Sequence, residues 1–248
     1  MIIRKSRDEI ATMRQAGRIV AQTLELIEKE IKPGVETIIL NNIAERFIRK
    51  SGSRPAFKGY KGFPASICTS LNEVVVHGIP GSQKLKDGDI ISIDIGVELK
   101  GYYADAAATY PVGEISKEAQ RLIETTRLAL EKGMSKCIDG NHLYDISHAI
   151  QITAESAGYS VVREFVGHGI GREMHEDPQI PNFGLPGRGP VIKEGMVFAI
   201  EPMVNIGGYK VNILPDHWTV VTADGSLSAH FEHTVAVTKD GPEILTVL

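Results

Sequence analysis

The 248-residue chain has few cysteines, no long apolar run and no block of like charges. Its 2 cysteines could form one disulfide at most, and without a secretion signal we expect two reduced thiols. No stretch approaches the roughly 18 apolar residues of a membrane-spanning helix. The formal net charge of −4 offers no electrostatic footprint for nucleic acid, and an apolar fraction of 42% excludes general disorder. These absences leave a globular protein of enzymatic size.

Internal similarity divides the chain into two related halves, about residues 1–112 and 113–248. A basic residue, an acidic residue, glycine and an apolar run ending in a carboxylate occur at 86–94 and again at 193–201. The motifs V-H-G-I-P at 76–80 and G-H-G-I-G at 167–171 also match. We therefore expect a single catalytic domain built from two related halves, in which approximate two-fold symmetry places Asp94 opposite Glu201.

Each half is predicted to hold two helices followed by strands. Ser6 and Glu9 form a capping-box pattern before a helix that continues to residues 32–34, and a second helix spans about 37–50. Ser116 caps a third helix, and a fourth runs through 143–153. The segments rich in β-branched residues are 64–77, 89–98, 102–112, 160–168, 196–206 and 229–238, and 176–190 is predicted as a surface loop. This order predicts an α+β fold with helices covering one face of a sheet.

Carboxylates interrupt four of the strand segments. Asp94 lies within I-I-S-I-D-I and Asp105 within Y-Y-A-D-A-A-A, while Glu201 ends V-F-A-I-E and Glu232 lies within H-F-E-H-T-V. One such residue is readily explained as an edge position or a single buried ion pair, but no Lys or Arg occurs in these segments to pair with four. A buried cluster of this kind protonates unless metal cations lie among its members.

Two divalent ions would nearly balance four carboxylates, and this charge count is the main physical argument for a metal site. Carboxylate oxygen with some imidazole suits Mn(II), Fe(II), Co(II) or Zn(II). A pair of such ions lowers the pKa of a water between them towards ~7 and polarises a carbonyl. The sequence therefore predicts metal-assisted hydrolysis as the reaction class.

Three of the eight histidines carry a functional interpretation. His77 and His168 are repeat partners next to glycine at predicted strand ends, and His175 lies on the loop that only the second half has. A single histidine is more often a surface or hydrogen-bonded residue than a ligand, so the interpretation depends on the repeat. The G-H-G-I-G run lacks the G-x-G-x-x-G spacing and opens no amphipathic helix, which argues against a dinucleotide loop.

The ordered set Asp94, Asp105, His168, Glu201 and Glu232, with the motifs V-H-G-I-P, G-H-G-I-G, E-P-M and F-E-H-T, resembles the type I methionine aminopeptidases of bacterial type. The resemblance covers essentially the whole chain. It implies the pseudo-two-fold "pita-bread" (creatinase/aminopeptidase) fold, a curved antiparallel sheet covered by helices. It also implies removal of the N-terminal initiator methionine from nascent proteins and peptides whose second residue is small, by dinuclear-metal-assisted hydrolysis.

The resemblance implies a role for each member of this set. Asp94 would bind one of two divalent ions and His168 the other, while Asp105 and Glu232 would bridge the pair. Glu201 would bind the ion held by His168 and also carry a proton from the attacking water to the leaving amine.

Two more histidines receive roles in the same way. His175 would stabilise the oxyanion at the scissile carbonyl, and His77 would hydrogen-bond the scissile amide nitrogen or the leaving group. The free α-amine of the substrate would ligate a metal ion, which would restrict cleavage to the N-terminal residue.

A methionine pocket needs apolar and aromatic walls, because the long, polarisable side chain packs well on rings. The positions that match such a pocket in the family are Phe57, Tyr60, Phe63, Cys68, His77 and Trp218. Judged without the family, the aromatic residues at 57–63 would simply anchor a glycine-rich loop. Met174 stands where the family often has an aromatic residue and Phe57 where it often has cysteine, so both bear on the shape of the pocket.

Two alternatives assign other activities to this fold. An Xaa-Pro aminopeptidase or dipeptidase usually carries an additional N-terminal domain, for which we expect no room in a chain that begins at its first helix. A non-catalytic peptide-binding member would have lost metal ligands, whereas all five are present. For the methionine aminopeptidase we expect a cytoplasmic monomer that acts on the N-terminal Met of nascent polypeptides. We also expect transient ribosome contact and neither a membrane nor a direct nucleic-acid site.

Overall fold

The computed structural model describes residues 2–248 and contains four α-helices within them. Their bounds are α1 Arg7–Glu28, α2 Thr37–Lys50, α3 Lys117–Met134 and α4 Leu143–Ser156. Ser6 begins α1 with the predicted capping box, because its hydroxyl accepts a hydrogen bond from the Glu9 N–H while the Glu9 carboxylate accepts one from the Ser6 N–H. Ser116 caps α3 as predicted.

The first helix is shorter than predicted. It ends at Glu28, whereas the apolar spacing predicted helix up to a stop at residues 32–34. Pro33 disfavours helical backbone at Lys32. The last turn of α1 also holds no basic residue to complement the negative end of the helix dipole. The chain therefore leaves the helix early and turns at Gly34, whose φ is 90°.

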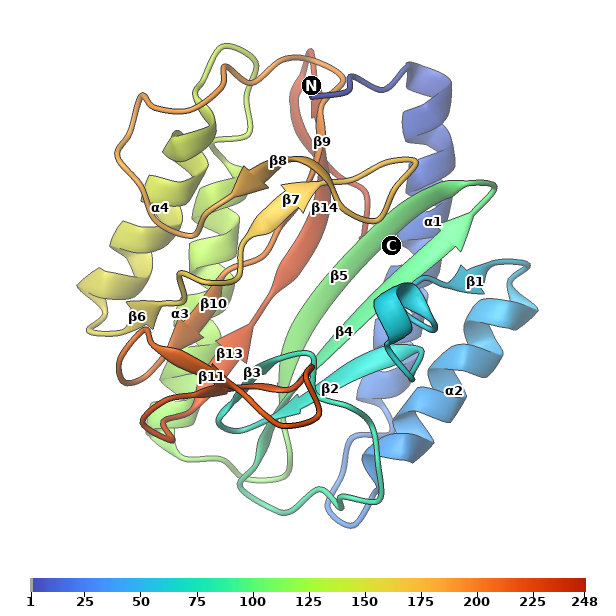
Figure 1. Ribbon diagram of the computed structural model, residues 1–248, viewed down its shortest axis with the longest axis vertical. Helices are drawn as coiled ribbons and strands as arrows, with labels where there is room; N and C mark the ends of the chain where they lie inside the picture. The colour runs from blue at the N-terminus through green and yellow to red at the C-terminus, as the bar shows by residue number, and fades with distance from the viewer. Residues whose placement is uncertain (1) are drawn as a thin grey trace.

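Nine strands of the described chain form an antiparallel sheet at the centre of the molecule (Figure 1). Their order is β1-β4-β5-β14-β9-β7-β8, with β2 also paired to β4 and β15 to β14. The bounds are β1 Arg54–Pro55, β2 Ile67–Leu71, β4 Ile90–Leu99, β5 Tyr102–Pro111, β7 Gly167–Gly169, β8 Glu176–Ile180, β9 Val197–Ile200, β14 Glu232–Thr238 and β15 Gly241–Ile244. The β5–β14 ladder joins the first and second parts of the chain.

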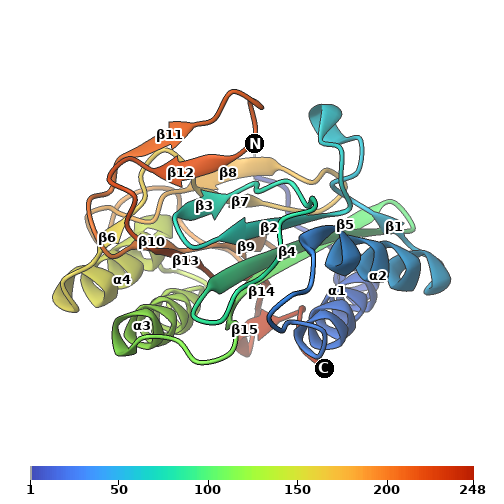
Figure 2. The same ribbon diagram turned by 90° about the horizontal axis from the view of Figure 1, so that it is seen from below.

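Residues 2–248 also form two small three-stranded sheets, with the orders β13-β10-β6 and β11-β12-β3. Their bounds are β3 Val74–Val76, β6 Ser160–Val161, β10 Met203–Asn205, β11 Val211–Ile213, β12 Val220–Thr222 and β13 Ser228–His230, and a 3-10 helix, η1, spans Tyr60–Gly62. Figure 2 shows the four helices on one side of the central sheet and β3, β11 and β12 on the other.

Apolar side chains fill the space between the helices and the sheet, and the two largest clusters lie under the two pairs of helices. α1 and α2 pack on β2, β4 and β5 through buried residues such as Val20 and Ile93. α3 and α4 pack on β9 and β14 through residues such as Leu122 and Phe198. The predicted α+β architecture, a curved antiparallel sheet covered by helices, is confirmed. The division of the domain into two related halves stays a prediction.

Several strand predictions are wrong in part. The segment 176–190, predicted as a surface loop, begins with β8, an edge strand in which Pro178 is tolerated. The predicted strand 160–168 is two strands, β6 and β7, that belong to different sheets. Four further strands lie outside every predicted segment, and they are β1, β11, β12 and β15. Each of them is only two to four residues long, too short to give a recognisable alternation.

Candidate active site

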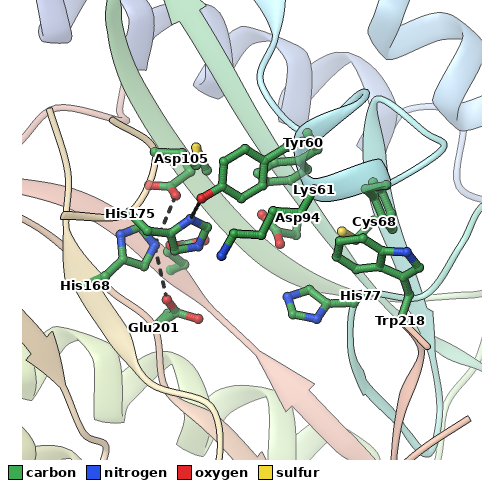
Figure 3. A pocket seen from close by; sticks show the side chains of 14 residues that line it. Tyr60, Lys61, Cys68, His77, Asp94, Asp105, His168, His175, Glu201 and Trp218 are labelled. Carbon is green, nitrogen blue, oxygen red and sulfur yellow. Dashed lines mark hydrogen bonds and ion pairs between the residues drawn. The ribbon is translucent and has the colours of Figure 1, made fainter. Parts of the chain in front are cut away.

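All twelve predicted site residues line one pocket (Figure 3). It encloses about 180 Å³. Pockets for drug-sized ligands measure roughly 300–1,000 Å³, so this one suits a single side chain. The twelve residues are Phe57, Tyr60, Phe63, Cys68, His77, Asp94, Asp105, His168, His175, Glu201, Trp218 and Glu232, and Lys61 and Met174 line the pocket with them.

The strand register directs three carboxylates to one face of the sheet. Asp94 on β4 and Glu232 on β14 are both cross-strand partners of Ala107 on β5, one from each side. Asp105 lies two residues from Ala107 on the same strand, so the alternation of side chains points it to the same face. Three carboxylates on adjacent strands therefore converge at the centre of the sheet.

The neighbouring strands β7 and β9 add an imidazole and a fourth carboxylate. His168 on β7 is the cross-strand partner of Ala199 on β9, and Glu201 follows two residues later. The Nε2 atom of His168 lies 3.6 Å from Asp105 Oδ2 and 3.6 Å from Glu201 Oε1. One ligand atom from each of Asp105, His168 and Glu232 lies within 4.8 Å of the other two. This spacing suits a shared metal ion.

The hydrogen bond of His168 fixes which of its nitrogens faces the carboxylates. Its Nδ1 lies 2.9 Å from the Gly169 carbonyl oxygen, so Nδ1 carries the proton and donates it. Nε2 then presents its lone pair, as in metal-binding histidines whose other nitrogen donates to the backbone. Burial lowers the pKa of His168 to about 4, which keeps the ring neutral at pH 7.

The four carboxylates have no basic partner in the part of the chain that the structure describes, since their ion-pair contacts are with histidines alone. Burial raises the pKa of Asp105 to about 7, although a hydrogen bond from Thr234 opposes the rise. Burial and the neighbouring acidic groups raise the pKa of Asp94, Glu201 and Glu232 well above their usual range. Within residues 2–248, Asp94 Oδ1 is enclosed without a hydrogen-bond partner.

These residues fit a divalent cation. They gather more negative charge than their surroundings neutralise, and they offer a carboxylate oxygen and an imidazole nitrogen that lack a proton donor. Oxygen and nitrogen donors of this kind are the ligands that first-row divalent ions take in proteins. The chemistry of the donor set therefore agrees with the metal site predicted from the sequence.

Next to the carboxylates, Tyr60 holds His175. The Tyr60 hydroxyl lies 2.8 Å from His175 Nδ1, and the two rings stack with centroids 5.3 Å apart. The ring of His168 lies on the other side, 4.2 Å from that of His175. Burial lowers the pKa of His175 to about 3, so the neutral ring has one nitrogen that accepts and one that donates.

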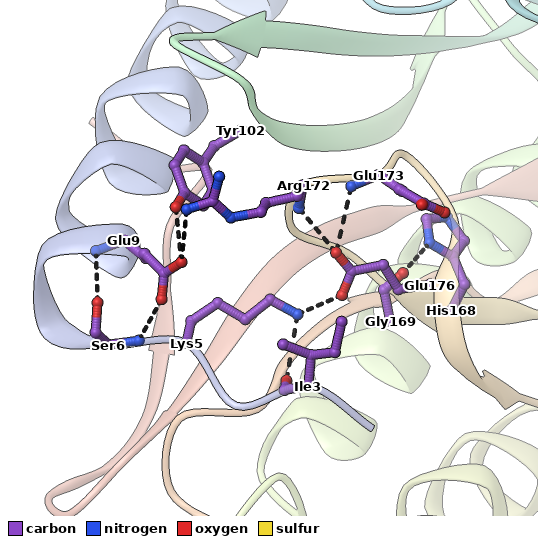
Figure 4. Close-up of polar contacts among 10 residues, drawn as sticks. All are labelled: Ile3, Lys5, Ser6, Glu9, Tyr102, His168, Gly169, Arg172, Glu173 and Glu176. Atoms are coloured by element: carbon purple, nitrogen blue, oxygen red, sulfur yellow. Dashed lines mark hydrogen bonds and ion pairs between the residues drawn. The ribbon is translucent and has the colours of Figure 1, made fainter. Parts of the chain in front are cut away.

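A buried ion pair fixes the turn that carries His175 (Figure 4). The Glu176 carboxylate accepts hydrogen bonds from the backbone N–H groups of Arg172 and Glu173, at 2.8 and 3.3 Å, and pairs with the Lys5 ammonium. The side chains of Lys5 and Glu176 are only 3% and 6% exposed. The segment that precedes α1 thus contributes to the position of His175.

The other end of the pocket is apolar and aromatic. Trp218 contacts Phe63 and His77 edge-on, with ring centroids 5.1 and 6.2 Å apart. Cys68 on β2 is the cross-strand partner of Asp94, so it lies where the apolar end meets the carboxylates. Burial raises the pKa of the Cys68 thiol well above its usual range, which keeps it protonated. This end offers the packing surface expected for an apolar side chain.

Two residues at the site were missed by the sequence reasoning. His230 is buried with its Nε2 3.8 Å from Glu201 Oε2. It lies two residues before Glu232, and this spacing on a strand segment was a signal that could have found it. Lys61 lines the pocket, but a lysine in a glycine-rich loop is indistinguishable in sequence from an ordinary surface residue.

Comparison with known proteins identifies the class. The chain matches the model of metallopeptidase family M24 over residues 11–239 and belongs to that family. It is 58% identical to a methionine aminopeptidase of Clostridium perfringens, over 100% of both chains. It is also 58% identical to methionine aminopeptidase 1 of Bacillus subtilis, over 99% of both chains. The crystal structure of methionine aminopeptidase from Thermotoga maritima superposes with a TM-score of 0.98 at 48% identity, covering 100% of both chains.

These matches confirm the resemblance to bacterial methionine aminopeptidases and the pita-bread fold expected from it. The family and the buried Asp, His and Glu cluster together indicate a divalent metal site. Among residues 2–248, no helix has the length and apolar character needed to cross a membrane. The roles of individual residues stay predictions.

Proposed function

We propose that this chain is a methionine aminopeptidase that removes the N-terminal methionine of proteins and peptides whose second residue is small. One observation carries the proposal: a single pocket joins a floor of carboxylates and imidazole to a wall of aromatic side chains. The floor provides hydrolytic chemistry and the wall selects the side chain. The names of relatives that match over their full length agree with this assignment.

The metal ligands in this proposal are Asp94, Asp105, His168, Glu201 and Glu232, and together they hold two divalent ions. Asp94 would hold one ion and His168 and Glu201 the other, while Asp105 and Glu232 would be shared by both. Fe(II), Mn(II), Co(II) and Zn(II) all suit this donor set. Such ions supply Lewis-acid polarisation of a carbonyl and acidify a water molecule.

Glu201 moves the proton in the proposed reaction. Its two carboxylate oxygens face different histidines. Oε1 lies 3.6 Å from His168 Nε2, and Oε2 lies 3.8 Å from His230 Nε2. A carboxylate whose pKa is raised by burial accepts a proton from the attacking water and returns it to the departing amine. His77 accepts a hydrogen bond from the N–H of the scissile amide or forms one with the leaving group.

His175 stabilises the negative charge that develops on the scissile carbonyl oxygen. The Tyr60 hydroxyl lies 2.8 Å from Nδ1 of the neutral ring. We assign the hydroxyl as the donor, which leaves the proton on Nε2. Nε2 is then the donor to the oxyanion, and a preorganised donor of this kind acts in a site from which water is largely excluded. The ion pair of Lys5 with Glu176 holds the turn in place.

Selectivity follows from the two ends of the pocket. The methionine side chain packs on Phe57, Tyr60, Phe63, Cys68 and Trp218, because a thioether makes favourable contacts with aromatic rings. The free α-amine of the substrate would ligate a metal ion at the carboxylate end, which restricts cleavage to N-terminal residues. We further propose that the substrates are nascent polypeptides, met by transient contact with the ribosome, and that the enzyme is a cytoplasmic monomer.

The test is the release of methionine from Met-Ala-Ser by protein stripped of metal and titrated anaerobically with Mn(II), Fe(II), Co(II) and Zn(II). Saturable, metal-dependent release supports the proposal and ranks the four ions. Tight metal binding without release contradicts it, and Xaa-Pro peptides are then the next substrates. Absence of both binding and release favours a non-catalytic peptide-binding protein.

A further inference from the structure

We propose that Lys61 is a specificity-determining residue that favours substrates whose third residue carries a carboxylate. The inference rests on the proposed aminopeptidase function and adds a substrate preference to it. Its basis is the placement of one unpaired cation at the aromatic rim of the pocket.

The backbone presents Lys61 in an unusual conformation. Lys61 lies in η1 with φ of 48° and ψ of 23°, in the left-handed region that side-chain-bearing residues rarely occupy. Hydrogen bonds from the Phe63 N–H to the Tyr60 carbonyl and from the Tyr60 N–H to the Phe57 carbonyl, both 2.9 Å, hold the turn. A non-glycine residue kept in such a conformation beside a pocket is a reason to look for a role in that pocket.

The Lys61 ammonium has no acidic partner among the described residues. It lies over the Tyr60 ring, 5.4 Å from the centroid, and Figure 3 shows its side chain extending from the rim into the pocket. Its charge acts on His175, whose pKa it helps to lower. Nearby Lys58 is different, because it forms an ion pair with Glu45 at 2.7 Å and does not line the pocket.

Lys61 is also the only Lys or Arg among the described residues that line this pocket. The α-amine of the substrate is expected among the acidic residues on the floor of the pocket. A peptide bound in this direction leaves the pocket past the rim, with its second and third residues within the field of the ammonium. A carboxylate there gains Coulomb attraction, whereas a second ammonium is repelled.

The expected size of the effect is modest because the lysine is exposed. Ion pairs between exposed side chains change an equilibrium by about twofold to fivefold. The attraction is present before and during the reaction, so it changes KM and leaves kcat nearly constant. Added salt screens it, with a Debye length of roughly 10 Å at 0.1 M and 3 Å at 1 M.

The experiment compares Met-Ala-Asp-amide, Met-Ala-Asn-amide and Met-Ala-Lys-amide on the metal-loaded enzyme. The amide removes the terminal carboxylate, so only the third side chain changes charge. We expect the wild type to show a KM about twofold to fivefold lower for the Asp peptide than for the Asn peptide, and a higher KM for the Lys peptide. Lys61→Gln removes these differences, Lys61→Arg keeps them, and 1 M salt reduces them in the wild type.

Lys58→Gln is the matched control, since it removes an equal charge from the same loop but outside the pocket, and it is expected to keep the wild-type ratios. Equal KM values for the three peptides in the wild type, or the same ratios in Lys61→Gln as in the wild type, would overturn the inference. Failure to release methionine from any of the three peptides would instead overturn the proposed function, and with it the preference that rests on it.

Discussion

Within residues 2–248, buried charged side chains gather in two places, and the two differ in how charge is balanced. At Lys5 and Glu176, one cation meets one anion, and two backbone N–H groups complete the hydrogen bonding of the carboxylate. At the centre of the sheet, four carboxylates have no cationic partner within the described chain, because their ion-pair contacts are with neutral histidines. The first group needs nothing from solution, whereas the second needs a cation that the chain does not supply.

The difference teaches how to interpret buried charge. Burying an ion costs several kcal/mol unless it is paired and hydrogen-bonded. Where a buried charge is paired within the chain, it fixes a turn. Where it is left unpaired, it forms a site for a ligand. Burial alone therefore does not mark the functional residues; the missing partner does.

The largest effect is expected from Glu201→Gln, which removes from the cluster of four carboxylates the one that is proposed to transfer the proton. Loss of a general base typically costs about 10²–10⁴ in rate, so kcat should fall by that factor and metal should bind more weakly. Methionine release and metal content measure the two effects. Glu131→Gln on the exposed face of α3 is the control, and a wild-type kcat in Glu201→Gln would refute the assigned role.

His175 connects the two regions, because it precedes Glu176 in the chain and contacts His168 in space. We expect His175→Ala to lower kcat by about 10²–10³, the usual cost of removing one oxyanion donor, with metal content unchanged. Steady-state kinetics and metal analysis of the same preparation test this. Loss of metal from the variant would make His175 a ligand instead.

Glu176→Gln removes the acidic partner of the buried ion pair and leaves Lys5 buried without its counterion. Removing one partner of a buried ion pair costs about 3–5 kcal/mol, measurable as the free energy of unfolding in urea. The double variant Lys5→Met, Glu176→Gln removes both charges and should recover a large part of that loss. Equal stability of the single and double variants would show that the charge of Lys5 is not the cause.

The pH dependence of stability separates metal-free from metal-loaded protein. In Asp105 the folded pKa is raised from an ordinary 3.8 to about 7, so folding favours the protonated form. That contribution is present at low pH and is lost as pH rises from about 4 through about 7. We expect the stabilisation by added metal to grow over this range, because the ligands must be deprotonated. A metal effect independent of pH would contradict this.

The smallest effect is expected from an exposed ion pair, which completes the comparison. Lys29 lies 3.0 Å from Glu25 at the end of α1, and both side chains face solvent. Lys29→Gln should change the free energy of unfolding by about 0.3–0.5 kcal/mol. A loss as large as that in Glu176→Gln would show that burial does not set the value of an ion pair here.

The cluster of four carboxylates could be predicted from the sequence because its members interrupt apolar strand segments. Asp94 and Asp105 interrupt strands of apolar residues, and the period of two along each strand places them on a common face. The helices were predictable for a similar reason, since the caps at Ser6 and Ser116 are local in sequence. Local rules suffice where neighbouring residues determine the structure.

The buried ion pair of Lys5 and Glu176 could not be predicted in this way. Lys5 and Glu176 are 171 residues apart, and each looks like an ordinary surface residue among its neighbours. The same holds for Lys61, whose position depends on the turn at 59–63 lying over a pocket built elsewhere. β8 was not predicted because Asp177 and Pro178 are residues typical of loops, although they lie in an edge strand. These features depend on tertiary contacts that no local pattern encodes.

The pairing of β14 with β5 also sets the order of events in a newly made chain. Thr234 and Asp105, which hydrogen-bond across this ladder, are 129 residues apart. At a synthesis rate of roughly 5–20 residues per second, on the order of ten seconds separate their emergence. A chain still on the ribosome therefore carries Asp94 and Asp105 well before Glu232 exists, so neither the central sheet nor the carboxylate cluster is complete until β14 has been made.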